Sequence, residues 1–351
     1  MEFVHQTLPQ RVRFAPGQAA AGVAAEVAEL DGRRVMLIAS DREAEDAARI
    51  AADVPVVVSH HEVAMHVPVP VAERAREVAR QHRADVVLTI GGGSATGLGK
   101  AVALTSGLPV IAVPTTYAGS EATDVWGMTE DGTKTTGVDA RVLPRSVVYD
   151  AGLTLSLPVD LTVASTLNAL AHSVDALWAP RADPINAALA LEGARGLVSA
   201  LPAVADEPEA MPGREGLLYG AYLAAVAFTS AGSGLHHKIC HVLGGRFDLP
   251  HAPTHAVVLP HVLALNAPFA PDAERRLADV FDADTAVAGL EALRRRVRAP
   301  GALRDLGLRE SDIPDAAEAI LPVVPASNPA PVGRDELERL LHDAWEGTDP
   351  R

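Results

Sequence analysis

The feature that most constrains the fold of this chain is a change of pattern near residue 150. Before it, short apolar runs at 33–40, 54–60, 85–90 and 108–114 alternate with helical spacing at 42–54, 69–84 and 99–107. Strands that alternate with helices predict a parallel sheet covered by helices on both faces. After it, strand-like runs are scarce, and long Ala- and Leu-rich segments predict helices at 161–179, 184–204, 214–234 and 335–347.

This change predicts two domains. A chain of 351 residues is too long for one simple core. We therefore expect an α/β domain over residues 1–155 and an all-α domain over 156–351, with the boundary near 150–158. Aromatic residues make up only 4% of the chain, so Ala, Val and Leu must build both cores.

Charge and cysteine content exclude several classes of function. The net charge of −15 and the absence of a basic stripe argue against binding to nucleic acid. Cys240 is the single cysteine, so the chain has no internal disulfide. We expect Cys240 to be a small packed residue rather than a nucleophile. The first residues do not resemble a signal peptide, and no apolar run approaches the ~18–20 residues that cross a bilayer. We expect a soluble, cytoplasmic protein that does not bind a membrane.

A glycine run, "TIGGGSATGLGK" at 89–100, follows one expected strand and opens a helix. Gly91, Gly92 and Gly93, with Ser94 beside them, allow close backbone approach and expose N–H groups, which favours a bound pyrophosphate. The spacing is neither a strict G-x-G-x-x-G nor a P-loop. A tight strand–helix turn without a ligand is therefore the alternative.

Hydroxyl side chains follow the next expected strand, where Thr115, Thr116, Tyr117 and Ser120 lie in "VPTTYAGSE". Ligands of open α/β sheets bind at the carboxyl ends of the strands, so two such edges favour a dinucleotide over a single phosphate. Asp41 follows the first strong strand and is placed to bind a ribose hydroxyl and disfavour a 2′-phosphate. An N-cap for the following helix is an equally good role for Asp41.

Six of the thirteen histidines lie between residues 234 and 261. Asn168 and His172 are four residues apart in one expected helix, as are His237 and His241 in another, so each pair shares a helix face. With His251, these histidines are candidates for a functional role. A metal site of this kind normally includes a carboxylate, and the uncharged amide of Asn168 is a weaker ligand.

The remaining histidines of this stretch are expected to be solvated or hydrogen-bonded structural residues: His236, His255 and His261. The helix that carries His237 is expected to break before His251, at Gly244, Gly245 and Pro250.

The sequence resembles the iron-containing, group III alcohol dehydrogenases, and within them the maleylacetate reductases. The matching stretches cover nearly the whole chain and include "GGGSATGLGKAVAL" (91–104), "PTTYAGSEAT" (114–123), "LNALAHSVDAL" (167–177) and "GLHHKICHVLGGRFDLPHAPTHAVVLPH" (234–261). The resemblance implies a Rossmann-like α/β domain and a helical domain in a dehydroquinate-synthase-like architecture. It also implies an active-site cleft between the domains and a homodimer.

The resemblance also predicts whether the chain binds a metal ion. In metal-dependent relatives an Asp and three His bind the ion, and these positions fall on Asn168, His172, His237 and His251. The maleylacetate reductase branch is similar at the first position and works without a metal. We therefore expect NADH or NADPH as the cofactor and no metal.

The activity implied is NAD(P)H-dependent reduction of the conjugated C=C bond of maleylacetate to 3-oxoadipate, in the degradation of aromatic compounds. Hydride transfer produces an enolate, for which hydrogen-bond donors can replace a metal. His172, His237 and His251 are the expected donors around the substrate. His241 is expected nearest the nicotinamide, for orientation or proton relay.

Further residues are assigned to the substrate. Tyr117 is expected to contact the nicotinamide or the substrate, and Lys238 either pairs with a substrate carboxylate or is a solvated helix lysine. Asn168, Arg246 and Asp124 are the candidate substrate-binding residues. Asp124 and Arg246 depart from the pattern of the branch, and "ASNPAP" at 326–331 lacks its Tyr and Arg.

Two rival functions stay open on the same scaffold. One is a metal-dependent alcohol or aldehyde oxidoreductase. The other is a recruited member, such as a lyase, a cyclase or a binding module, that binds the nucleotide or an intermediate without redox turnover.

Overall fold

The computed structural model describes residues 2–130 and 133–350. The chain divides into two compact units, one of Leu8–Leu157 and the other of Met1–Thr7 with Pro158–Arg351. The sequence placed residues 1–7 in the α/β domain, whereas the structure groups them with the helical unit. Within that unit, His5 Nδ1 lies 2.9 Å from a carboxylate oxygen of Asp183.

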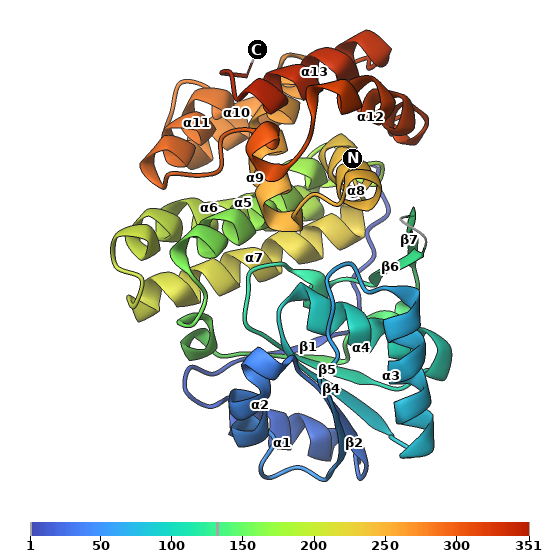
Figure 1. The fold of residues 1–351 in the computed structure, drawn as a ribbon. Helices are drawn as coiled ribbons and strands as arrows, with labels where there is room; N and C mark the ends of the chain where they lie inside the picture. The colour runs from blue at the N-terminus through green and yellow to red at the C-terminus, as the bar shows by residue number, and fades with distance from the viewer. Residues whose placement is uncertain (1, 131–132, 351) are drawn as a thin grey trace. The chain divides into compact units, whose positions relative to one another are not determined.

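The Leu8–Leu157 unit contains a six-stranded sheet in the order β1-β8-β5-β4-β2-β3, and all of its strand pairs are parallel (Figure 1). The strands are β1 (Arg11–Phe14), β2 (Val35–Ile38), β3 (Val56–His60), β4 (Val86–Gly91), β5 (Val110–Pro114) and β8 (Ser146–Tyr149). The strand order reverses at β2, which has β3 on one side and β4 on the other. Such a reversal is where ligands bind in open α/β sheets.

Helices cover both faces of this sheet, as the alternating pattern predicts. Along β2, Val35 and Leu37 belong to one apolar cluster, while Met36 and Ile38 belong to another. The first cluster includes residues from α1 (Ala19–Glu29) and α2 (Ala44–Ile50). The second includes residues from α3 (Val69–Gln81) and α4 (Gly93–Ser106). Because both faces are buried, β2 is apolar at every position.

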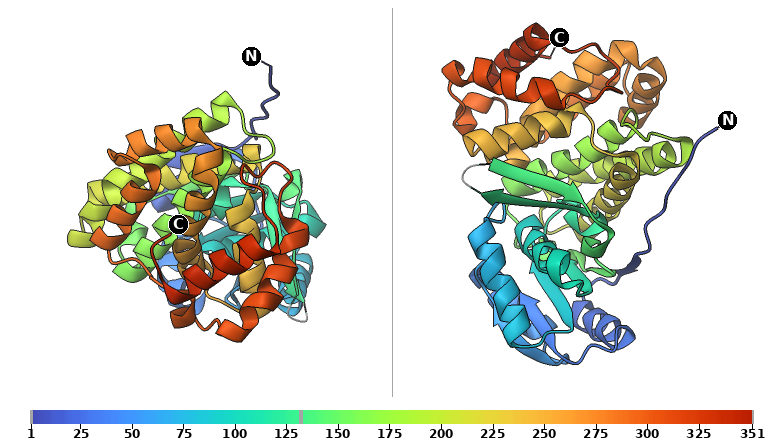
Figure 2. Two further views of the ribbon diagram at one scale, coloured as in Figure 1. Left: turned by 90° about the horizontal axis from the view of Figure 1, so that it is seen from above. Right: turned by 90° about the vertical axis from the view of Figure 1, so that its right-hand side faces the viewer.

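Four strands of this unit were not predicted from the sequence. β1 and β8 are each four residues long, and β1 carries two arginines in its sequence RVRF. β6 (Val125–Glu130) and β7 (Thr133–Val138) form a separate antiparallel ribbon, drawn in green in Figure 2. The sequence of β7, TKTTGV, is mostly polar and has no apolar run to reveal a strand.

The regular structure of the other unit is helical, as predicted, with no strand among its described residues. Three long helices pack together: α5 (Val159–Ala176), α6 (Pro184–Asp206) and α7 (Met211–Ala231). A Cβ added to Gly193 of α6 would lie 2.9 Å from the backbone oxygen of Gly220 in α7. Small residues therefore let these two helices approach backbone to backbone. α6 is long and apolar enough to cross a membrane by length and composition, but it is half buried against its neighbours.

Six further helices follow in the same unit, and the first two and the last two of them share one apolar core. They are α8 (Leu235–Phe247), α9 (His251–Asn266), α10 (Pro271–Phe281), α11 (Ala286–Arg296), α12 (Ile313–Ile320) and α13 (Arg334–Glu346). The expected break at Gly244 and Gly245 was wrong, because α8 continues through both to Phe247. It ends where Asp248 adopts a left-handed conformation with φ 54°, and Pro250 then precedes α9.

Candidate functional site

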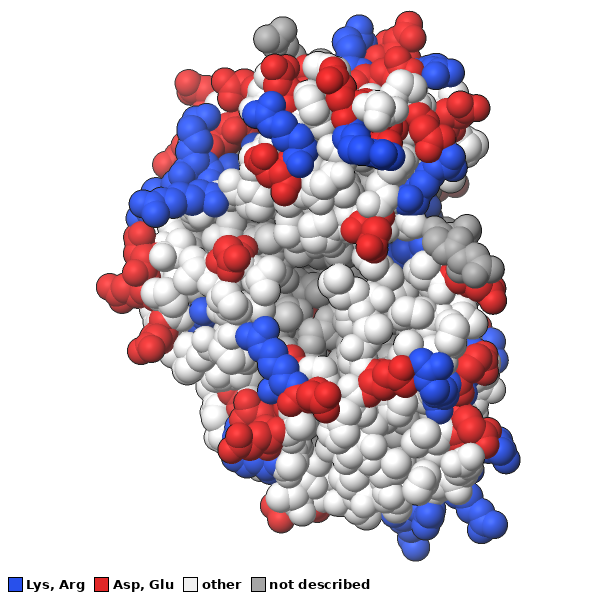
Figure 3. All heavy atoms as spheres, in the orientation of Figure 1, with Lys and Arg blue, Asp and Glu red and all other residues white. Residues whose placement is uncertain are grey.

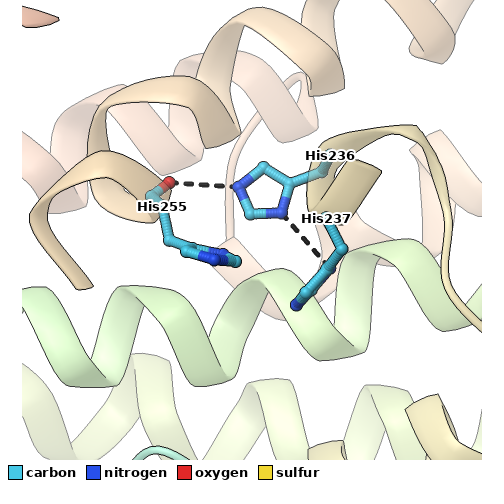
Figure 4. Close-up of side chains that lie close together, drawn as sticks. All are labelled: His236, His237 and His255. Atoms are coloured by element: carbon cyan, nitrogen blue, oxygen red, sulfur yellow. Dashed lines mark hydrogen bonds between the residues drawn. The ribbon is translucent and has the colours of Figure 1, made fainter. Parts of the chain in front are cut away.

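Aromatic rings from four helices gather around His237 of α8 in the helical unit. The ring of His172, from α5, stacks on it at 4.8 Å between centroids with an interplanar angle of 16°. Phe228 of α7 packs against both rings, at 4.3 Å from His237 and 4.8 Å from His172. His236 and His255, the latter from α9, complete the cluster at 5.0 and 4.9 Å from His237 (Figure 4).

Two hydrogen bonds determine which ring nitrogen carries the proton in His236 and in His237. His237 Nδ1 lies 2.7 Å from Oδ2 of Asp175, which also accepts backbone N–H groups and so acts as an acceptor. His236 Nε2 lies 3.1 Å from the carbonyl oxygen of His255. The network therefore assigns the hydrogen to Nδ1 in His237 and to Nε2 in His236.

The cluster holds neutral imidazoles because it is buried. Burial lowers the pKa of His172 to about 4, and repulsion from His236 contributes. Burial also lowers the pKa of His237 and of His255 well below the usual value. The pKa of Asp175 is raised, again mainly by burial. Each shift reflects the cost of a charge away from water.

Several polar atoms of the cluster, and one of Asn168 one helical turn before His172, are buried without a hydrogen-bond partner among the described residues. They are Oδ1 of Asn168, Nδ1 of His172, Nε2 of His237 and both ring nitrogens of His255. Buried polar atoms are normally satisfied, so such a group of atoms is typical of a ligand site. Nε2 of neutral His237 and Oδ1 of Asn168 are acceptors.

The residues at the metal positions of the family do not form that family's ligand set. Asn168 offers an uncharged amide where metal-dependent relatives have a carboxylate, and the Asp175 carboxylate is occupied by His237. Among the described residues, the group whose ligand atoms lie within 4.8 Å of one another is instead His236, His237 and His255. In this trio, Nε2 of His236 lies against the carbonyl oxygen of His255, and Nδ1 of His236 lies 3.4 Å from Nδ1 of His237, which also contacts Asp175.

The other predicted residues of this stretch lie around the cluster. The ring of His241 meets that of His237 edge-on at 6.1 Å, and the ring of His251 packs against that of His255 at 4.3 Å. Lys238 is half-buried on the same helix. The assigned roles of these residues stay predictions.

His255 differs from expectation, since it is neither solvated nor hydrogen-bonded through its ring. His236 and His261 are both buried, and the ring of His236 is hydrogen-bonded, as a structural residue would be. Cys240 is packed in the apolar core that α8 and α9 share with α12 and α13. Burial raises the pKa of its thiol well above the usual value, which does not suit a nucleophile.

Arg246 is exposed near the end of α8 and forms a two-pronged ion pair with Asp315. Its Nε and Nη2 lie 2.7 and 2.5 Å from the two carboxylate oxygens. A substrate carboxylate would have to compete with Asp315 for this guanidinium, and the substrate-binding role stays a prediction.

In the Leu8–Leu157 unit, the glycine run forms the turn between β4 and α4. Gly91 has φ 144°, a conformation that favours glycine, and Gly92 precedes the first turn of α4 without a side-chain cap. A Cβ at Gly92 would lie 2.9 Å from Cγ2 of Thr116, and one at Gly93 would lie 3.3 Å from Cβ of Ala118. The glycine run and the hydroxyl-bearing segment therefore lie against each other.

Asp41 is exposed just beyond β2, at the start of a short 3₁₀ helix. The N-cap of this helix is Ser40, so the alternative role of Asp41 as an N-cap was wrong. The ribose-binding role stays a prediction. Glu43, which the sequence did not single out, lies nearer the glycine turn, since a Cβ at Gly91 would be 3.9 Å from its Oε2.

The other predicted residues of this unit have varied surroundings. Tyr117 is fully buried, and its hydroxyl donates to Thr154 Oγ1 at 3.0 Å. Ser94, Thr115, Ser120 and Asp124 are all partly exposed, and Ser120 opens a short 3₁₀ helix. Tyr117 thus packs in the core beneath the segment, while the partly exposed residues can reach a ligand.

Sequence reasoning missed the buried Lys100 of α4. Its Nζ donates to Thr123 Oγ1 at 2.8 Å and to the carbonyl oxygen of Val125 at 2.9 Å. Burial lowers its pKa to about 7, opposed by the carboxylates of Glu121 and Asp124. It joins the helix of the glycine run to the segment that follows β5.

Asp175 and Phe228 were missed as well. Asp175 lies seven residues after Asn168 and three after His172 on α5, so its helical spacing was visible in the sequence. Phe228 carried no such signal, because it lies on a different helix.

Two family models match the chain. The model "Iron-containing alcohol dehydrogenase" matches residues 9–151, and "Fe-containing alcohol dehydrogenase family, C-terminal" matches residues 162–345. Together they span both units of the structure.

Individual relatives match over the full length. A maleylacetate reductase from Pseudomonas knackmussii is 44% identical over 100% of this chain and 99% of its own. The crystal structure of an iron-containing alcohol dehydrogenase from Corynebacterium glutamicum is 55% identical with a TM-score of 0.97, covering 100% of this chain and 98% of that one. The structure of maleylacetate reductase from Agrobacterium tumefaciens is 41% identical with a TM-score of 0.94, covering 100% of both. The chain therefore belongs to the iron-containing alcohol dehydrogenase family and is an oxidoreductase related to the maleylacetate reductases.

Proposed function

We propose that this enzyme transfers a hydride from NADH or NADPH to the conjugated C=C bond of maleylacetate, or a closely related oxo-enedioate, and gives 3-oxoadipate without a metal ion. The observation that carries the proposal is the buried histidine cluster with Asn168 at the position of the family's carboxylate ligand. The similarity to maleylacetate reductases over the whole chain supports the choice of substrate.

The chemistry requires a donor for the oxygen of the substrate ketone. Hydride adds to the alkene carbon remote from the ketone, the electron pair moves to the ketone oxygen, and a proton then adds to the carbon beside it. Neutral His237 offers a lone pair at Nε2, so it donates to this oxygen only after it takes up a proton there. A bound dianion favours that protonated ring, because opposite charge stabilises it. His172 lies next to His237 as a second polar group for the substrate.

The cofactor is assigned to the Leu8–Leu157 unit. The uncapped N-terminus of α4 and the Gly92 turn suit the pyrophosphate, with the Thr116 side chain directly beside the turn. Asp41, beyond the neighbouring strand β2, suits a ribose hydroxyl.

The proposal also covers the binding partners, the oligomeric state and the cellular location of the enzyme. Its partner is a small oxo-acid, and it acts as a homodimer in the cytoplasm without nucleic acid or membrane. In support, acidic and basic side chains are interspersed on the face drawn in Figure 3 rather than gathered in a basic patch, and the net charge is −15.

The test is oxidation of NADH and of NADPH with freshly prepared maleylacetate, before and after treatment with a chelator, with 3-oxoadipate identified by NMR. We expect turnover that survives chelation in protein that contains far less than one metal ion per chain. Near-stoichiometric iron or zinc, with activity lost on chelation, would overturn the metal-free reaction and favour a metal-dependent oxidoreductase. Nucleotide binding without oxidation across a panel of oxo-acids and aldehydes would favour the recruited member.

The variant Asn168→Asp tests whether the amide at residue 168 accounts for metal-independent activity. A carboxylate here restores the charged ligand of metal-dependent relatives, so we expect the substitution to raise affinity for Zn²⁺ by at least about tenfold, or ~1.4 kcal/mol. Its charge should also weaken binding of the dianionic substrate and raise KM. Asn168→Leu is the matched control and should gain no metal. Equal Zn²⁺ binding by the wild type and both variants would contradict the role of residue 168.

A further inference from the structure

The carboxylate of Asp175 contacts His237 at both its backbone and its ring. Asp175 is fully buried on α5. Its Oδ2 accepts the backbone N–H of Gly234 at 3.1 Å, the backbone N–H of His237 at 3.3 Å and the ring Nδ1–H of His237 at 2.7 Å. The contact with the ring is the shortest of the three. One oxygen atom thus caps the start of α8 and orients the histidine in its first turn.

The residue opposite this carboxylate is a glycine for a steric reason. A Cβ at Gly234 would lie 2.4 Å from Oδ1 of Asp175, closer than any side chain tolerates. The backbone of Gly234, with φ −88°, does not itself require glycine. Gly234 therefore makes room for the carboxylate.

Three further rings pack closely around His237. His172 stacks on one face of the ring, Phe228 packs at 4.3 Å, and His255 lies at 4.9 Å. Figure 4 shows the second nitrogen of His237 directed away from His236. This nitrogen, Nε2, is buried without a partner among the described residues.

We propose that Asp175 is the positioning residue of His237: it holds the hydrogen on Nδ1 and thereby leaves Nε2, which faces the substrate, as the atom at which the ring takes up the proton that it then donates. This inference rests on the proposed function for the identity of the substrate, but its geometry does not depend on it. A neutral imidazole in water prefers the hydrogen on Nε2, so without Asp175 the presented atom would carry the single ring hydrogen, and no carboxylate at Nδ1 would stabilise the ring when it takes up a second proton. A buried carboxylate that sets the tautomer of a histidine is an established device in other enzymes.

The first measurement is the tautomer of His237 in the wild-type protein. Histidine labelled with ¹⁵N in the ring distinguishes a protonated from an unprotonated Nδ1 by NMR, and His237→Gln assigns the signal. We expect Nδ1 protonated and Nε2 unprotonated in the protein without substrate. The opposite tautomer would overturn the proposal, whatever the enzyme turns over.

The second measurement compares Asp175→Leu with a matched control, Asp183→Leu. Asp183 is also buried, caps the start of α6 through the backbone N–H groups of Ile185 and Asn186, and contacts the ring of His5. Both variants lose a buried cap and a histidine contact, so both should be less stable. Only Asp175→Leu should shift the His237 signal to the other tautomer and lower kcat by at least about 100-fold, with the Kd for NADH changed less than about threefold.

The conservative variant Asp175→Asn provides the rescue. Its amide oxygen can still accept the three N–H groups, so we expect it to keep the wild-type tautomer and to retain more kcat than Asp175→Leu. Equal kcat values for Asp175→Leu and Asp183→Leu would overturn the proposal, as would an unchanged tautomer in Asp175→Leu. Failure of the proposed function has a different outcome, namely a wild-type enzyme with the expected tautomer and no turnover of maleylacetate.

Discussion

At the scale of single residues, burial sets the protonation states of the titratable side chains at both candidate sites. The imidazoles of the cluster are neutral because they are buried, and Asp175 is placed to orient one of them. The same effect acts on Lys100 in the other unit, whose pKa is lowered to about 7 by burial. A lysine that loses its proton so easily links the stability of its unit to pH.

Stability of the Leu8–Leu157 unit should rise with pH through the action of Lys100. Above pH 7 the folded unit loses this proton, whereas the unfolded chain keeps it up to about pH 10.4. The unfolded state then binds more protons, so the free energy of unfolding increases with pH by at most about 1.4 kcal/mol per unit between these values. Lys100→Met should lack this contribution.

The measurement is denaturant unfolding of the wild type and Lys100→Met from pH 7 to pH 10. Trp126 is the single tryptophan of this unit, so its fluorescence reports on it when Trp178 and Trp345 are replaced by Phe. Lys100→Arg is the control, because arginine stays charged in both states and should lack the slope too. A difference between wild type and Lys100→Met that does not vary with pH would contradict the shifted pKa.

At the scale of elements, the turn between β4 and α4 organises the candidate cofactor site. The turn ends a central strand beside the reversal of strand order, and it opens a helix whose first N–H groups lack a side-chain cap. Three small residues in a row keep the turn close to the hydroxyl-bearing segment after β5.

Gly92→Ala should therefore weaken binding of the cofactor. Its Cβ would lie 2.9 Å from Cγ2 of Thr116, so the turn or the Thr116 segment must move. We expect the Kd for NADH, measured by calorimetry, to rise by about tenfold or more, or ~1.4 kcal/mol. Gly301→Ala is the control, since its Cβ would meet nothing within 4 Å and should leave the Kd unchanged. An unchanged Kd in Gly92→Ala would place the pyrophosphate elsewhere.

At the scale of the whole molecule, two units of different architecture carry the two candidate sites. The cofactor residues belong to the α/β unit, and the histidine cluster belongs to the helical unit. Within the described residues, β1 is an end strand of the six-stranded sheet and pairs with β8 alone. An open strand edge is a place where a second chain can add.

We expect the enzyme to be a homodimer in solution. Light scattering coupled to size-exclusion chromatography should give about twice the chain mass of 36.6 kDa and should keep this value on dilution. The control is the same measurement at high salt, where the dimer mass should persist. An association that depended only on surface charge would weaken as ions screen it. A monomer mass at every concentration would exclude the homodimer.

The fold and the residue types of both sites were readable from the sequence, because local patterns carry them. Alternating apolar runs predicted the parallel sheet, and the helical spacing of Asn168, His172, His237 and His241 identified the two histidine helices. β1 and β7 were not predicted because charged or polar residues interrupt them, and β6 and β8 were not singled out although both contain apolar residues. Their partners stabilise them, as β8 does for β1.

The sequence by itself determined which chemical groups are present: glycines after a strand, paired histidines, and an amide where relatives have a carboxylate. Only the tertiary structure decided how those groups act. It brought Asp175 against His237, placed His255 in the cluster rather than in solvent, and engaged Arg246 with Asp315. These contacts join residues from different helices, and burial then sets their protonation. Neither effect is encoded in local spacing, because both depend on which elements pack together.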